Sequence, residues 1–204
     1  MATTTNYSWS TPDNTAYVKD GASAIRTLGS SVDTTLFTAL GGAYPGLRLI
    51  KKQTIGTGVS SVSVTSAFSA TYENYQIIVS GGVASGYSDI NIQLTGITTG
   101  YYWAARYSSY GSTTPQASST LNTSSFFVGS GTPDTNHVNC YIQNPYATKA
   151  KKMTANFDNL LAGGASGELQ GFNLSTTSAT AFTITPSAGT LTGGTIYVYG
   201  YGIS

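Results

Sequence analysis

The sequence predicts a mainly β protein, in which an antiparallel β-sandwich, most simply a jelly roll, follows an N-terminal α-helical coiled-coil neck. Three observations predict this fold class. Small and apolar residues recur at helical spacing before residue 41, whereas from Leu47 onward hydrophobicity alternates with a period of two in short runs. The 204 residues also include 24 Gly and 15 Tyr, and only 8% are charged, which suits short strands with polar outer faces.

The helical neck is expected at residues 12–41. Its seam advances by four and three residues in turn, which is the spacing of a coiled coil. Two interpretations stay open on this pattern. The first, indicated by the small residues on the seam, is the neck of a parallel, symmetric trimer, and the second is one helix packed on its own domain. The seam consists of Val18, Ala22, Ile25, Gly29, Val32 and Leu36.

Signals at both ends bound this helix. Ser10 or Thr11 can cap the first turn, Pro12 suits the first helical position, and Gly41-Gly42 is a stop signal. Because Gly, Ser, Thr and Asp in the interior are weak helix formers, we expect the helix to need a partner. The two glycines also open a short linker, with a domain boundary expected at about residue 45.

Residues 1–11 are expected to be a docking segment. Tyr7 and Trp9 stand in a polar context in which a free N-terminus would fray. Aromatic side chains are frequent anchors at protein interfaces, so these two are candidates for docking on another protein. The alternative is that both rings fold back on the head, residues 45–204.

The head is expected to contain many short antiparallel strands. Clusters of Gly, Pro, Asn or Ser separate nearly all of them, and no helical period intervenes. The expected strands are Leu47–Ile55, Val59–Thr65, Tyr75–Ser80, Asp89–Thr95, Tyr101–Ser109, Ser125–Gly129, His137–Gln143, Lys151–Asp158, Leu169–Ser175, Ala181–Thr185 and Thr195–Tyr201.

Alternation assigns faces to several of these strands. Val138, Cys140 and Ile142 should point into the core, with Cys140 acting as a small hydrophobic side chain. The strand that begins at Lys151 should have a solvated near end. A similar inward row is expected from Ile90, Ile92 and Leu94.

The last strand has no plainly polar face. Its outward row carries Tyr197, Tyr199 and Tyr201, whereas its inward row carries Ile196 and Val198. A neighbouring subunit covering the three tyrosines explains the pattern. Cover by loops of the same chain explains it equally well.

The segment from Tyr101 to Tyr110 is denser in aromatic residues than a sandwich core requires. Such rings, next to Ser and Gly, suit a surface that binds a sugar or a protein receptor. The alternative is a strand with one face in the core and the other at a subunit interface. The polar stretch Ser112–Ser124 is expected to be an outward loop. Candidate ligand residues are Tyr102, Trp103, Arg106, Tyr107 and Tyr110.

The sequence offers little for catalysis, and no enzyme is expected. A glycosidase needs two carboxylates facing each other across a sugar, and nothing brings Glu73 to Asp158 or Glu168. One His and one Cys exclude an internal disulfide and make a metal site or a cofactor unexpected. The basic cluster Lys149, Lys151 and Lys152 is interpreted as a solvated strand end in preference to an anion site.

The overall charge and hydropathy exclude two kinds of partner. A net charge of +1 provides no basic stripe for nucleic acid. No run of residues is apolar enough for membrane insertion. The N-terminus shows no pattern of a secretory signal.

Two segments resemble a known group of proteins. The stretch Asn6–Leu36, NYSWSTPDNTAYVKDGASAIRTLGSSVDTTL, resembles the N-terminal segment of tailed-bacteriophage structural proteins. It shares an aromatic lead, a Pro-Asp turn, a Val-Lys-Asp-Gly step and an Ala-Ile-Arg-x-Leu-Gly helix. The closing segment Gly189–Ser204 and the run Tyr72–Tyr75 look, less specifically, like parts of the β-domain that often follows.

This resemblance implies a virion component made in the host cytoplasm and released by lysis. It implies a homotrimeric short tail fibre that attaches to another virion protein by its N-terminus. Its head would then recognise a host surface glycan or protein. The alternative is a capsid or tail decoration protein with a purely structural role, which the absence of a shaft between neck and head leaves open.

The seam hypothesis predicts that Ile25→Asp converts a trimer to monomers. The substitution places a charge without a partner on the seam, which is strongly destabilising. Molar mass measured by light scattering should fall to that of one chain. An unchanged mass in solution would contradict the neck hypothesis.

Overall fold

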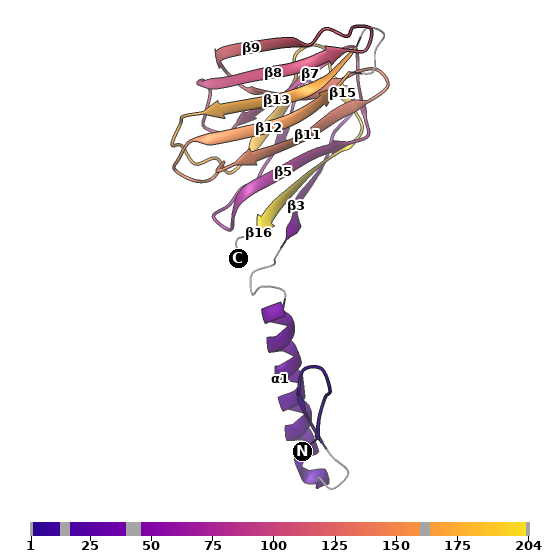
Figure 1. The fold of residues 1–204 in the computed structure, drawn as a ribbon, viewed down its shortest axis with the longest axis vertical. Helices are drawn as coiled ribbons and strands as arrows, with labels where there is room; N and C mark the ends of the chain where they lie inside the picture. Colours follow the sequence, from indigo (N-terminus) through magenta and orange to yellow (C-terminus); the bar gives the residue numbers. More distant parts are fainter. Residues whose placement is uncertain (1, 13–16, 40–45, 160–163, 203–204) are drawn as a thin grey trace. The chain divides into compact units, whose positions relative to one another are not determined.

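The computed structural model describes residues 2–12, 17–39, 46–159 and 164–202. Contacts divide the chain into two compact units, an N-terminal unit of residues 1–46 and a β-rich unit of residues 47–203 (Figure 1). The predicted stop at Gly41-Gly42 and the boundary at about residue 45 lie outside the described residues.

The N-terminal unit contains a small hairpin and one helix. Strand β1 (Ala2–Thr3) pairs antiparallel with β2 (Ser10–Thr11). A 3-10 turn, η1 (Val18–Asp20), leads into helix α1 (Gly21–Ala39). This is the one α-helix among the described residues, so the coiled coil stays a prediction.

The predicted start of the helix is wrong. Ser10 and Thr11 pair with β1 and do not cap a helix, and Pro12 is not helical. The 3-10 turn begins after Tyr17, which makes no side-chain capping bond. Ser10 and Thr11 are therefore part of the hairpin, in which β1 pairs with their backbone groups.

The β-rich unit confirms a mainly β fold. Predicted strands were found close to their expected ranges, and two of them, β8 and β12, have the bounds predicted. The strands are β3 (Leu47–Thr54), β4 (Val62–Val64), β5 (Tyr72–Ser80), β6 (Val83–Ala84), β7 (Ser88–Leu94), β8 (Tyr101–Ser109), β9 (Gln116–Thr123), β10 (Phe126–Gly131), β11 (Asn136–Gln143), β12 (Lys151–Asp158), β13 (Ala165–Asn173), β14 (Phe182–Pro186), β15 (Leu191–Thr192) and β16 (Thr195–Gly202).

Twelve of these strands form one large antiparallel sheet with the order β4-β14-β7-β10-β11-β12-β13-β8-β9. Strand β11 is its branch point. One edge of β11 pairs with β5, and the other pairs first with β10 and then with β12. Beyond β5 the sheet continues through β16 to β3. In Figure 1, β9, β8, β13, β12, β11 and β5 lie side by side, with β7 behind them.

Aromatic contacts join strands that are not hydrogen-bonded neighbours. The ring of Tyr101 on β8 lies edge-on to Phe126 on β10, with 4.7 Å between ring centroids. Phe127 on β10 likewise contacts Phe157 on β12, with a centroid distance of 5.5 Å. All four side chains belong to one buried hydrophobic cluster. The strands on the two sides of this cluster therefore share a core, which edge-on and tilted packing of rings stabilises.

The predicted inward rows are confirmed. Val138, Cys140 and Ile142 are buried, and so are Ile90, Ile92 and Leu94 on β7. Burial raises the pKa of the Cys140 thiol to about 12. The thiol is therefore neutral at physiological pH and packs as a small apolar group.

Lys151 corrects the prediction of a solvated strand end. Its side chain is fully buried, in one inward row with Met153 and Ala155. The ammonium donates hydrogen bonds to the carbonyl oxygens of Ala147, Lys149 and Ser175 at 2.7, 2.7 and 3.0 Å. Because every ammonium proton has an acceptor, burial of this charge is tolerated.

The outward loop predicted at Ser112–Ser124 is also wrong over most of its length. Residues Gln116–Thr123 form β9, which pairs antiparallel with β8. The strand is almost entirely exposed and consists mainly of Ser, Thr, Asn and Gln. These residues adopt a strand because their backbone pairs with β8. Their side chains do not show the apolar alternation from which a strand is predicted.

We predict that Lys151→Met lowers the free energy of unfolding by about 2–4 kcal/mol, because three buried carbonyl groups lose their donor. Urea unfolding measures the loss. Lys152→Met is the matched control, since the neighbouring side chain is exposed and should change stability by about 0.5 kcal/mol or less. Equal effects of the two substitutions would show that the buried ammonium does not tie the loop before β12 to the segment after β13.

Candidate functional site

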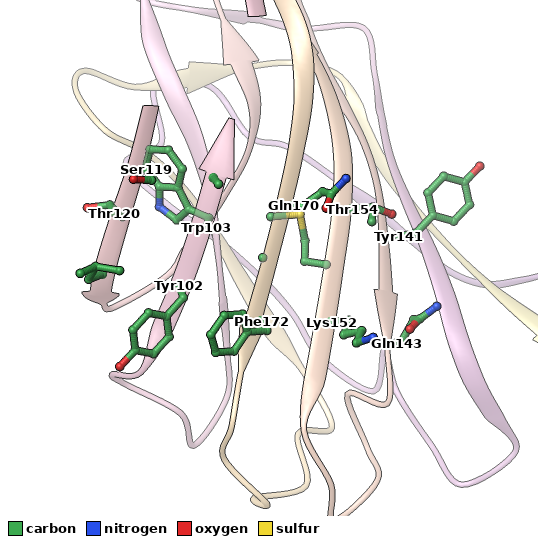
Figure 2. A pocket seen from close by; sticks show the side chains of 14 residues that line it. Tyr102, Trp103, Ser119, Thr120, Tyr141, Gln143, Lys152, Thr154, Gln170 and Phe172 are labelled. Carbon is green, nitrogen blue, oxygen red and sulfur yellow. The ribbon is translucent and has the colours of Figure 1, made fainter. Parts of the chain in front are cut away.

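A groove of about 700 Å³ crosses the outward face of β9, β8, β13, β12 and β11 (Figure 2). Its volume lies within the range of small-molecule sites. It spans five adjacent strands and so extends about 19 Å across them, at about 4.8 Å per strand spacing. We call this surface the groove.

Two rows of cross-strand partners build the groove. In the first row the Cα partners run from Gln143 on β11 through Lys152 and Phe172 to Tyr102 on β8. These four side chains share one face because the sheet is antiparallel and in register. The first row therefore combines an amide, a cation and two rings.

The second row lies two residues further along the same strands. It runs from Tyr141 on β11 through Thr154 and Gln170 to Ala104 on β8 and Ser119 on β9. Its side chains offer hydroxyl and amide groups that can both donate and accept hydrogen bonds. The small Ala104 leaves space beside the aromatic pair of the first row.

The aromatic pair in the first row is tightly stacked. The rings of Tyr102 and Phe172 are 4.8 Å apart between centroids and only 6° from parallel. Phe172 is still 41% exposed, and Figure 2 shows its ring between Tyr102 and Lys152. Each ring restricts the orientation of the other, so the pair presents a rigid apolar surface.

The structure separates the five ligand residues predicted on the aromatic segment. Tyr102 and Trp103 line the groove, although Trp103 also packs edge-on against Phe127. Tyr107 packs against Phe157 of the core. Arg106 is exposed but lines a separate, smaller hollow, and Tyr110 lies beyond the end of β8.

Sequence reasoning missed most of the groove. Phe172, Gln143 and Lys152 belong to strands far from the aromatic segment in sequence, and only the register of the sheet brings them to it. The alternation of β11 is a local signal for one further groove residue, because Tyr141 stands between the inward Cys140 and Ile142 and so lies on the outward face.

The tyrosines of β16 stay candidates for a subunit interface. Tyr197, Tyr199 and Tyr201 are each partly exposed. The ring of Tyr201 lies 6.3 Å from that of Tyr141, and the ammonium of Lys52 lies 5.8 Å from the ring centroid of Tyr197. Tyr141 thus links this tyrosine row to the groove.

The seam residues on the N-terminal unit are largely exposed in the single chain. Val18 is 98%, Ile25 67% and Leu36 54% exposed. Ala22 and Gly29 are also exposed, and Val32 is half-buried. An apolar stripe on a helix normally packs against another surface.

The hairpin covers another side of α1. The indole nitrogen of Trp9 donates a hydrogen bond to the Thr35 hydroxyl at 2.9 Å. Tyr7 stacks on Trp9 with 5.1 Å between ring centroids and is itself 62% exposed. Trp9 is thus placed by its own unit, whereas the outer ring of Tyr7 is accessible to a docking partner.

The acidic residues considered for catalysis do not line the groove. Glu73 pairs with Lys149 at 3.1 Å. Asp158 accepts a hydrogen bond from the Tyr110 hydroxyl, which raises the pKa of that tyrosine. Over the described ranges, no three His, Cys, Asp or Glu side chains gather as a metal site would require.

Comparison of the chain with models of protein families, with curated proteins and with solved structures gives no match. The phage resemblance of Asn6–Leu36 therefore stays a prediction. In the part of the chain that the structure describes, no helix has both the length and the apolarity to cross a membrane.

We predict that Phe172→Thr costs about 1 kcal/mol or less in folding stability, because exposed cross-strand pairs contribute little. Phe126→Ala, a change in the buried core, should cost about 3–5 kcal/mol. Thermal or urea unfolding compares the two variants. A cost for Phe172→Thr as large as that for Phe126→Ala would mean that the stacked pair is a core element and not a free binding surface.

Proposed function

We propose that this chain is a non-enzymatic virion protein of a tailed bacteriophage, a short homotrimeric tail fibre that recognises the host surface. The N-terminal segment attaches it to the particle, and the β-rich unit is displayed. The observation that carries the proposal is the groove, an accessible surface with stacked rings, hydroxyls, amides and one cation.

The contents of the groove support binding and not turnover. Its lining contains no Asp, Glu, His or Cys. Hydrolysis of a glycosidic bond by the usual route needs two carboxylates, and acyl transfer needs a nucleophile with a base. A stacked aromatic pair with amides and hydroxyls can hold a ligand without either.

The exposed seam of η1 and α1 supports assembly of three chains. Its stripe of Val18, Ile25 and Leu36 would be covered by the same stripe of two other copies. Ser30→Asp is a matched control for Ile25→Asp, because Ser30 borders the hollow beside Trp9, away from the seam. The control should keep the mass of the trimer.

Attachment to the particle is proposed from the N-terminal sequence resemblance. The exposed ring of Tyr7 is the candidate contact with another virion protein, and Trp9 holds the hairpin on α1 in the orientation that presents it. This assignment gives the hairpin a function besides covering one side of the helix.

We further infer that the two branches of the sheet form a β-sandwich. The contacts of Tyr101 with Phe126 and of Phe127 with Phe157 support it, because they join strands across the core and not along the ladder. The groove then lies on the outside of one layer, opposite the core.

A decoration protein is the competing function. In that case the groove and the β16 tyrosines would be covered by neighbouring subunits on the particle. Antibody labelling of intact particles separates the two. Label at the tail extremity supports a receptor-binding fibre, whereas label spread over the capsid contradicts it.

We predict that the fluorescently labelled full chain binds host cells, and that Phe172→Ser abolishes most of this binding. Leu174→Ser is the matched control. Leu174 is an exposed apolar residue just beyond the same strand and does not line the groove. Equal cell binding by both variants, measured by flow cytometry, would exclude the groove as the recognition surface.

A further inference from the structure

We propose that the groove binds an acidic glycan, with a sugar ring stacked on Phe172 and an anionic substituent of that ring or its neighbour bound by Lys152. This inference rests on the proposed function, because it names the ligand class of the same surface.

The three lysines of the basic cluster have three different environments. Lys149 is paired with the carboxylate of Glu73 at 3.1 Å. Lys151 is buried and its ammonium is bound by three backbone carbonyls. Lys152 lines the groove, and among the described residues no ion pair is found for it. Of the cluster, Lys152 is the cation placed to meet a ligand.

Its position in the first row determines what it can meet. Lys152 stands between Gln143 and Phe172 as cross-strand partner of both. Side chains at such positions have Cβ atoms about 4.5–5.5 Å apart. A ring lying on Phe172 would therefore carry its substituents within reach of the ammonium and of the Gln143 amide.

The charge of the lining favours an anion. Lys152 is the one charged residue among those that line the groove, and no carboxylate there compensates it. A negative substituent would gain a charge-assisted hydrogen bond, which is about twice as strong as a neutral one. One cation is too few for a polyanion such as nucleic acid, which several basic residues must neutralise.

The remaining groups favour a saccharide over a peptide. The apolar C–H face of a pyranose can stack on an aromatic ring, while its hydroxyls need partners that both donate and accept. Thr154, Gln170 and Gln143 supply such groups on three adjacent strands. The groove runs across these strands, so a linear oligosaccharide lying across them would contact both rows.

The test uses acidic bacterial oligosaccharides that contain hexuronic acids, each paired with its carboxyl-reduced, neutral form. The full-length protein is titrated with both forms by calorimetry. Wild type should bind at least one acidic member about tenfold or more tighter than its neutral form, the effect of one charge-assisted hydrogen bond. Raised salt should weaken only the acidic complex.

Variants identify the residues responsible. Lys152→Met should remove the preference for the acidic form and leave the affinity for the neutral form unchanged. Lys149→Met is the matched control and should keep the preference, because Lys149 does not line the groove. Phe172→Ser should weaken both forms together.

Three results would overturn the inference: no member of the panel binds, acidic and neutral forms bind equally, or a polyglutamate peptide binds as well as the acidic glycan. Each is distinguishable from failure of the proposed function. If the chain binds host cells through Phe172 and Lys152→Met binds them equally well, recognition stands and the acidic glycan is wrong. If the chain does not bind cells, the proposed function itself is wrong.

Discussion

The structure depends most on the pairing of one strand, β11, with three others. One of its edges bonds to β5, and the other bonds to β10 and then to β12. The register of β11 therefore determines which side chains enter the core from two directions. A slip by one residue would expose Cys140 and bury Tyr141. The pairing of β11 thus determines both the row that is buried on one face of the sheet and the residues of β11 that line the groove on the other.

Much of the β-rich unit could be predicted because its strands alternate. Val138, Cys140 and Ile142 showed their inward direction without knowledge of any neighbour. Strand β9 could not be predicted this way, since its residues are mostly polar and exposed and only pairing with the edge of β8 makes them a strand. Lys151 was assigned to solvent because it stands in a basic cluster at the start of a strand, and the carbonyls that bind it come from two separate segments.

The candidate site was only partly predictable for a related reason. Aromatic density singled out Tyr102, but it could not separate the outward Tyr102 from Tyr107, which packs on the core. The residues that complete the groove lie on four other strands, and a register between distant strands leaves no local signal. The exposed stripe on α1, by contrast, could be predicted from the sequence, because its residues are spaced three or four positions apart within one segment.

The buried ammonium of Lys151 also has a mechanical consequence. It joins the loop after β11, the start of β12 and the segment after β13. These are the strand ends that carry Gln143, Lys152 and Phe172, the first row of the groove. Because one ammonium holds these three strand ends together, a pulling force on a molecule bound there would act on all three strands. The first row would then separate as a unit and not strand by strand.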